Sequence, residues 1–243
     1  MAVTDAKEMP TLCGAWQCEF EPIRRETANG LIGGDANAFE MAAPRWGMRF
    51  RMDHPTNADL ATMRAWVLSL RGGQVSLLGW DRKHPRLAAY FGVDDLDSIT
   101  ADTTAVKADS TLTYTADETI EPWGNPRITA IDSANRTITL GDFTSGATVT
   151  AGDAISWFDG RNWVLVKATE TKSANSSGVI SALTVEPRLS AHPGVTGYAL
   201  PLYVRVVKAA CEMRVDPASI SIPSDYTFGG AVEFSAYQII RRS

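Results

Sequence analysis

An alternation of apolar with charged side chains at residues 45–53, interrupted only by Gly47, constrains the fold more than any other feature of the chain. The apolar positions are Trp46, Met48, Phe50 and Met52, and the charged positions are Arg45, Arg49, Arg51 and Asp53. Successive side chains of a β-strand point to opposite faces of a sheet, so this pattern predicts a strand with one apolar face. The arginine face is open to three interpretations: a solvated face, a subunit interface or a nucleic-acid contact.

The same period of two recurs along most of the chain, whereas helical spacing occurs once. Strands are expected at 16–21, 74–80, 128–131, 137–140, 154–158, 163–168, 179–186, 200–206, 220–222 and 232–236. A helix is expected at roughly 58–71, with a Thr56/Asp59 capping box and a buried stripe of Leu60, Met63, Val67 and Leu70. Residues 26–38 are interpreted as a glycine-rich turn region. We therefore predict a mainly β protein with one helix packed on a sheet.

The longer alternating strands lie at the two ends of the chain, and a threonine-rich segment of short strands lies between them. Threonine is β-branched and favours strands, and the short spacing between turns is typical of a small β-barrel or sandwich. We expect residues 1–105 and 198–243 to form one β-sandwich domain that carries the helix. Residues 106–197 are expected to form an inserted small β-barrel or sandwich.

Composition excludes several classes of protein. The chain has 243 residues, with 23 basic and 28 acidic side chains and a net charge of −5, which disfavours nucleic-acid binding. The absence of an 18-residue apolar run predicts no membrane insertion, and the first residues have no apolar signal core. The three cysteines, Cys13, Cys18 and Cys211, are an odd and sparse set, so we expect reduced thiols made in a reducing cytoplasm.

The sequence offers few candidates for catalysis. It has no GxSxG or HExxH motif, and the glycine run at 30–34 lacks the GK[ST] ending of a phosphate loop. No catalytic residue, metal ligand or cofactor is assigned, and the chain is predicted not to be an enzyme. The densest acidic cluster is Asp94, Asp95 and Asp97. A solvated loop, a cation site and an acid pair of a glycosidase are the alternatives for this cluster.

Two tryptophans flank a predicted hairpin turn at Asp159-Gly160. A two-residue loop would place Trp157 and Trp163 on opposite faces, whereas a three-residue loop would place them diagonally on one face. Only the second register could form an indole platform for a sugar or a base. Trp123, Trp157 and Trp163 are therefore the candidates for glycan stacking, and the competing interpretation puts one indole in the core.

The strand Pro44–Met52, the capped helix up to Gly72 and the Trp80–Pro85 loop together resemble minor tail proteins of long-tailed bacteriophages, in particular distal tail proteins. The segments 151–153, 185–189 and 233–236 are also similar to that group. The resemblance implies a β-sandwich belt domain with one helix that forms a ring, usually a hexamer, between the tail tube and the hub. In some members the second β domain binds carbohydrate. Here that domain is expected to be inserted, which departs from the family pattern.

The resemblance therefore implies a structural protein of the virion tail tip, or baseplate, that is synthesised and assembled in the host cytoplasm. Its expected partners are further copies of itself, a tail tube protein and a tail hub protein. The alternative is a carbohydrate-binding β-sandwich protein that contacts host surface glycans, and a tail-associated hydrolase is the third class. The candidate subunit interface pairs Arg45, Arg49 and Arg51 of one copy with Asp94, Asp95 and Asp97 of the next.

Overall fold

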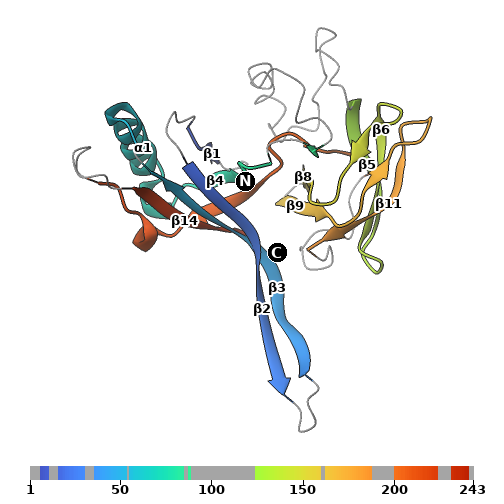
Figure 1. Ribbon diagram of the computed structural model, residues 1–243, viewed down its shortest axis with the longest axis horizontal. Coiled ribbons are helices and arrows are strands. Elements are labelled where there is room, and N and C mark those ends of the chain that lie inside the picture. Colours follow the sequence, from blue (N-terminus) through green and yellow to red (C-terminus); the bar gives the residue numbers. More distant parts are fainter. Residues whose placement is uncertain are drawn as a thin grey trace. The chain divides into compact units, whose positions relative to one another are not determined.

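The computed structural model describes residues 6–10, 16–30, 36–53, 55–84, 87–88, 124–159, 162–187, 200–223 and 231–240, and between residues 24 and 43 it describes the backbone. The predicted mainly β class with one helix is confirmed. The chain forms two compact units (Figure 1). Thr4–Gly79 and Cys211–Arg242 form the helix–sheet unit, and a second unit, the barrel unit, includes Trp80–Ala210.

The helix–sheet unit is built on a six-stranded sheet in the order β1-β4-β13-β14-β3-β2. The strands are β1 (Lys7–Glu8), β4 (Leu77–Trp80), β13 (Ala210–Val215), β14 (Val232–Gln238), β3 (Ala36–Met52) and β2 (Trp16–Gly30). The alternation that opened the sequence analysis lies in β3, which runs antiparallel to both β2 and β14. Its apolar positions are buried and its arginines are exposed, as predicted.

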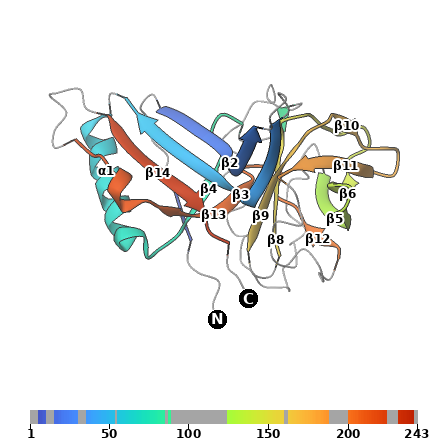
Figure 2. The same ribbon diagram turned by 90° about the horizontal axis from the view of Figure 1, so that it is seen from below.

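Helix α1 (Asn57–Ser69) packs on the apolar face of this sheet. Thr56 and Asp59 form the predicted capping box. Figure 2 shows α1 beside β14, and the Trp66 ring lies 5.5 Å from the ring of Phe234 on β14. Leu60, Met63 and Leu70 are buried as expected, whereas Val67 is half-buried and Trp66 takes its place in the core. The chain then turns through a short 3-10 helix, η1 (Arg71–Gly73), where Gly72 has the positive φ of 64° that favours glycine. A second one, η6 (Pro217–Ser219), follows β13.

Residues 26–30 and 36–38 form paired strands, which corrects the interpretation of 26–38 as a glycine-rich turn region; residues 31–35 lie outside the described residues. The β2–β3 pairing continues from Trp16↔Met52 out to Gly30↔Ala36, so the hairpin is much longer than the alternating core segments. We call the outer part, Arg25–Gly30 paired with Ala36–Ala42, the arm. Register shifts between Ile23 and Glu26 separate the arm from the rest of the hairpin. Its sequence, rich in alanine and with glycine at Gly30, lacks the apolar alternation from which strands were predicted.

The barrel unit contains a six-stranded sheet in the order β12-β5-β6-β11-β9-β8. Its strands are β5 (Gly124–Asp132), β6 (Thr137–Phe143), β8 (Ala154–Phe158), β9 (Trp163–Ala168), β11 (Ile180–Glu186) and β12 (Leu202–Tyr203). A bridge between Ser156 and Arg205 joins the two ends of this sheet into a nearly closed barrel. A separate two-stranded ribbon pairs β7 (Thr148–Val149) with β10 (Lys172–Ser173).

The barrel unit extends beyond the expected inserted domain of residues 106–197 on both sides. Leu87 is fully buried in the barrel core, among residues such as Ile128, Leu140 and Trp157. On the other side, β12 pairs with β5, so residues 202–203 belong to the barrel sheet. The bounds of β8 and β9 coincide with the two strands expected at 154–158 and 163–168.

Candidate assembly surface

The face of the helix–sheet unit that α1 leaves uncovered carries the three predicted arginines. Arg45, Arg49 and Arg51 alternate along β3 and are exposed. The neighbouring strands place acidic side chains beside them. Glu19 of β2 stands opposite Arg49, and Glu233 of β14 stands opposite Arg51 in the pairing register.

The resulting face has mixed charge, whereas the arginines of β3 alone would make it cationic. Arg51 Nη1 lies 2.9 Å from Glu233 Oε1, and Arg51 Nε lies 2.8 Å from Asp53 Oδ1. The hydrogen bond to Asp53 and the charges of Asp53 and Glu233 raise the pKa of Arg51 above its ordinary value. Alternation along one segment revealed the arginines and Asp53, but Glu19 and Glu233 come from strands whose order in the sheet a single sequence does not give.

Arg45 and Arg49 form no ion pair with another described residue. Their proposed partners, Asp94, Asp95 and Asp97, lie outside the described residues. The pairing of these arginines with the acidic cluster of a neighbouring copy therefore stays a prediction.

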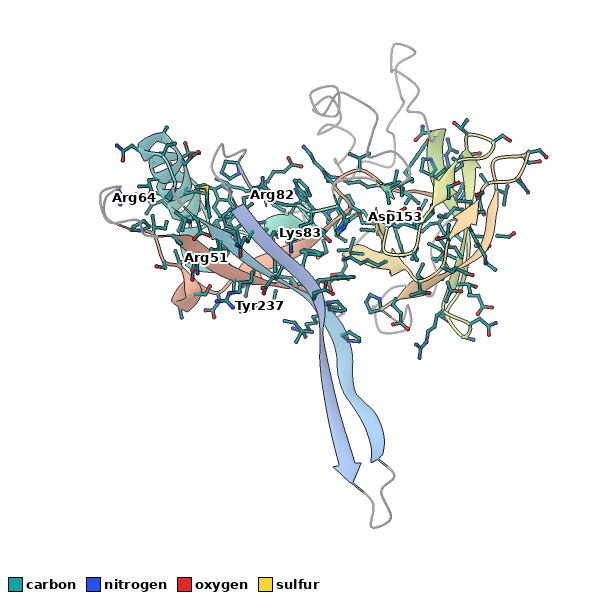
Figure 3. All side chains as sticks on the ribbon, viewed as in Figure 1. Arg51, Arg64, Arg82, Lys83, Asp153 and Tyr237 are labelled. Carbon is teal, nitrogen blue, oxygen red and sulfur yellow. The ribbon has the colours of Figure 1, made fainter. Side chains whose placement is uncertain are left out.

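Two large apolar side chains interrupt the charges of this face. Ile23 of β2 is 53% exposed and Tyr237 of β14 is 42% exposed. Gly47 of β3 lies between them: it pairs with Tyr237, and a Cβ placed on it would lie only 2.5 Å from Ile23 Cδ1. We call Ile23, Gly47 and Tyr237 the open-face patch. Figure 3 shows Tyr237 and Arg51 on the two neighbouring strands.

The outward side of α1 carries mostly small side chains, together with one leucine and one arginine. Its exposed uncharged members are Asn57, Ala58, Ala61, Thr62, Ala65 and Leu68. Leu68 is 78% exposed. Arg64, four residues before Leu68, is exposed as well and donates a hydrogen bond to the Pro223 carbonyl; Figure 3 labels it on this helix. Sequence reasoning did not single out the exposed Leu68.

The arm presents two edges without strand partners among the described residues. β2 is the last strand of the sheet order, so its outer edge has no neighbour there. On the other side, the β14–β3 pairing ends at Tyr237↔Gly47, and the Gln238 side chain then accepts a hydrogen bond from the Trp46 amide at 3.2 Å. The β3 edge of the arm lies beyond this point. Figure 1 shows β2 and β3 running on together past the other strands of their sheet.

Trp157 and Trp163 do not form a stacking platform with each other. The observed register pairs Trp157 with Val164 and Phe158 with Trp163, so the loop between β8 and β9 has neither of the two lengths considered. Trp157 has 0% exposure in the barrel core and cannot stack on a glycan. Trp163 points to the other face, where its ring lies 5.7 Å from that of Phe158. Trp123 lies outside the described residues.

The barrel unit holds a cluster of ionisable side chains that links two of its segments. Asp81 Oδ2 lies 3.1 Å from both His84 Nδ1 and Lys167 Nζ. Burial raises the pKa of Asp81, but the hydrogen bonds from His84, Lys167 and the Lys83 amide outweigh burial and bring it below its ordinary value. The cluster ties the segment after β4 to β9.

A second buried carboxylate, Asp153, has the opposite shift. Burial raises its pKa above the ordinary value, and the amides of Thr150 and Ala88 that donate to it compensate only in part. Of the cysteines, Cys18 and Cys211 are free and buried, and burial raises the pKa of the Cys211 thiol well above its usual range. No group of three or more metal-ligating side chains occurs in the described part of the chain.

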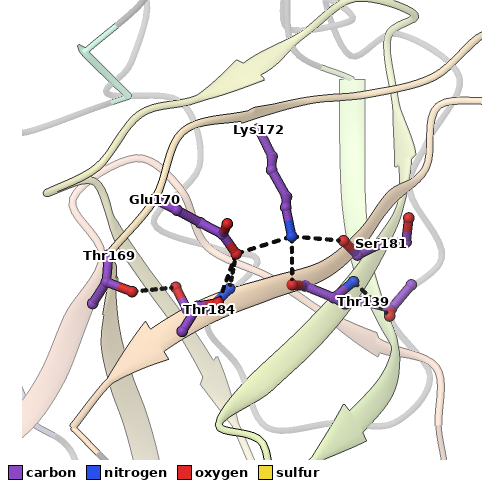
Figure 4. Close-up of polar contacts among 7 residues, drawn as sticks. Thr139, Thr169, Glu170, Lys172, Ser181 and Thr184 are labelled. Atoms are coloured by element: carbon purple, nitrogen blue, oxygen red, sulfur yellow. Dashed lines mark hydrogen bonds and ion pairs between the residues drawn. The ribbon is translucent and has the colours of Figure 1, made fainter.

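A polar network on the barrel supports a bulge in β11. Ala182 has a positive φ of 50°, and the β11–β6 register shifts between Ile180 and Leu183. Lys172 Nζ donates to the carbonyls of Ser181 and Ala182 and lies 2.9 Å from Glu170 Oε1 (Figure 4). Hydrogen bonds from the Thr184 hydroxyl and from Lys172 lower the pKa of Glu170 to about 2. All these groups serve the local backbone, so we assign them no ligand.

Comparison of the sequence with protein-family models and with curated proteins finds no match. In the described residues, no helix is long and apolar enough to cross a membrane.

Proposed function

We propose that this protein is a structural component of a bacteriophage tail tip that assembles, through its helix–sheet unit, into a ring between the tail tube and the hub. The observation that carries the assembly is the arm, a two-stranded ribbon whose two edges pair with no other described strand. A two-stranded hairpin is marginally stable by itself in water, and an open edge is a template for pairing with another chain.

The two open edges belong to different strands, which fits head-to-tail pairing. If all copies point the same way, the β2 edge of one arm meets the β3 edge of the next, and the two strands run antiparallel. Repetition of this contact around a rotation axis closes a ring with no free edge. The resemblance to distal tail proteins adds the expected location, the virion tail tip, and the expected number of copies, usually six.

The proposal includes no catalytic step and no cofactor. The tail tube and hub proteins would be the neighbours of the ring along the tail. Glycan binding loses support because Trp157 is in the core and Trp163 packs on Phe158.

Assembly can be tested on the purified full chain by mass photometry combined with negative-stain imaging. We expect closed rings with one dominant mass that is an integer multiple of 26.3 kDa. Co-expression with a tail tube protein from the same genome then tests the location, because a tail-tip ring should cap one end of assembled tubes. A chain that stays monomeric at all concentrations, or rings that bind no tube end, would refute the proposal.

A further inference from the structure

We propose that the barrel unit binds an anionic polysaccharide along a band of cations and aromatic rings. The band, which we call the cationic band, consists of two aromatic rings and the cations that lie against them: Arg127, Tyr203, Lys208, Trp80 and Arg82. All of these residues belong to the barrel unit, so the proposal goes beyond ring assembly and does not depend on it.

Trp80 holds two cations against one ring. Arg82 Cζ lies 5.3 Å from the centroid of the Trp80 ring, and Lys208 Nζ lies 5.7 Å from it. A cation within about 6 Å of an indole centroid is attracted by the negative face of the ring. Two cationic side chains from distant parts of the chain are thereby held near each other, although like charges repel. An anion that binds beside them relieves this repulsion.

Tyr203 provides the second ring. Leu202, Val204 and Val206 pack on the barrel core, so Tyr203 points outward from the same strand, and it is 41% exposed. Arg127 Cζ lies 4.4 Å from the ring centroid, and Arg127 Nη2 donates a hydrogen bond to the Tyr203 hydroxyl at 2.9 Å. The guanidinium fixes the ring, and the exposed part of the ring is available to the apolar face of a sugar.

One short segment connects the two rings. It runs from Tyr203 to Lys208, and an extended chain of this length spans at most roughly 17 Å. Lys208 has a positive φ of 45°, which is uncommon for a lysine, and strained backbone of this kind gathers at ligand sites. The cationic band is therefore long enough to contact several units of a polymer.

The charge of these segments favours an anionic ligand. Residues 80–84 and 203–208 contain four lysine and arginine side chains, Arg82, Lys83, Arg205 and Lys208. Lys83 follows Arg82 on the segment after β4 (Figure 3), and neither Lys83 nor Lys208 forms an ion pair with another described residue. The one acid of the two segments, Asp81, is buried and already bound by His84 and Lys167. A further carboxylate, Asp142, pairs with Arg127.

The rest of the chain argues for a polysaccharide over a nucleic acid. The protein has a net charge of −5, so a polymer as densely charged as a nucleic acid is repelled outside the cationic band. An anionic polysaccharide has more widely spaced charges and apolar sugar faces, which match cations that alternate with rings. Trp157 and Trp163, the tryptophans considered for glycan stacking, take no part in this band.

Binding can be measured by calorimetry on the full chain with three probes. These are a short sulfated dextran, neutral dextran of the same length and a single-stranded oligothymidylate with the same number of charges. We expect the sulfated dextran to bind, with an affinity that falls as the salt concentration rises, and the neutral dextran not to bind. No binding of the sulfated dextran, equal binding of the neutral one, or tighter binding of the oligothymidylate would overturn the proposal.

Variants test which residues make the contact. Lys83→Gln combined with Lys208→Gln removes two charges and should weaken the binding of sulfated dextran by ~5-fold or more. Tyr203→Leu removes the exposed ring and should weaken it by ~3-fold, at high salt as well as at low salt. Arg71→Gln, which removes one exposed charge of the helix–sheet unit, is the control and should bind like the parent.

Thermal melting identifies the variants that keep the fold. Lys83→Gln alone, at an exposed turn, keeps the test valid if the change at Lys208 prevents folding. Folded variants that bind sulfated dextran as tightly as the parent would show that the cationic band is not the site. None of these outcomes bears on ring assembly, which is measured separately.

Discussion

The two units of this chain differ in how completely their own strands pair with one another. In the barrel unit, the sheet order and the Ser156–Arg205 bridge leave the six strands nearly closed on themselves. In the helix–sheet unit, β2 is an edge strand of 15 residues, and the arm has no third strand among the described residues. An edge of that length is a liability unless a partner covers it.

Exposed large apolar residues occur in both units, so the difference between the units lies in their sheet edges. The barrel buries Trp157 completely and joins its own segments with ion pairs such as that of Asp81 with Lys167. Exposed large apolar side chains are Ile23, Leu68 and Tyr237 in the helix–sheet unit and Leu200 and Tyr203 in the barrel unit. We infer that the open strand edges of the helix–sheet unit are the part that assembles.

The largest expected effect is a truncation inside the closed unit. Trp157→Ala removes a fully buried indole and should lower the free energy of unfolding by ~3–5 kcal/mol. Hydrogen exchange measured by mass spectrometry should show the loss of protection in β8, β9 and β11. As the control, Trp163→Ala should cost clearly less, because that indole is only half-buried. Equal losses for the two variants would mean that the barrel core is not where we place it.

A matched pair of leucines in α1 separates packing from exposure. Leu70→Ala should cost ~2–5 kcal/mol, since Leu70 is 2% exposed. Leu68→Ala makes the same chemical change two residues away, at a position that is 78% exposed, and should leave the stability of the monomer almost unchanged. Denaturant titration at a concentration below assembly measures both. Similar losses in the two variants would refute the outward orientation of Leu68.

The capping box predicts a smaller loss in the same helix. Thr56→Ala removes the hydroxyl that accepts from the Asp59 amide at 3.1 Å and should cost ~0.5–2 kcal/mol. Thr56→Ser keeps the hydroxyl and serves as the control, with stability close to that of the parent. A parent-like melting curve for Thr56→Ala would show that the cap does not stabilise the folded protein.

The Glu170 network predicts a local pH dependence in the barrel. Because its pKa in the folded state is about 2, below the ordinary value of 4.5, the stabilisation is complete above the ordinary value and disappears as the pH falls through about 2. Carbon-13 NMR of the Glu170 carboxyl should give this midpoint directly. Thr184→Val should raise it, and Thr129→Val, at an exposed site on β5, should not. A parent midpoint near 4.5 would contradict the hydrogen bonds in Figure 4.

Sequence patterns predicted those helices and strands that have one buried face and one exposed face. The capping box and most of the α1 stripe were readable, as were β8 and β9, because helical and strand periods are local. The arm was missed because its sequence does not alternate between apolar and polar residues. The acids beside Arg49 and Arg51 were missed because strand order depends on contacts far apart in the chain. The first and last residues of the barrel unit could not be predicted from the sequence either. Leu87 joins the barrel core and Leu202 joins its sheet only through tertiary packing.

The central claim, that the open edges of the helix–sheet unit drive assembly, is tested most directly by shortening the arm. Residues 26–40 are replaced by a two-residue Asn-Gly turn, which removes the outer pairs and leaves the pairing of β3 with β14 intact. The mass of parent and variant is then measured by mass photometry over the same concentration series. We predict rings for the parent and a folded monomer of about 25 kDa for the variant. A parent that remains at 26.3 kDa, or a shortened variant that still forms rings, would contradict the claim.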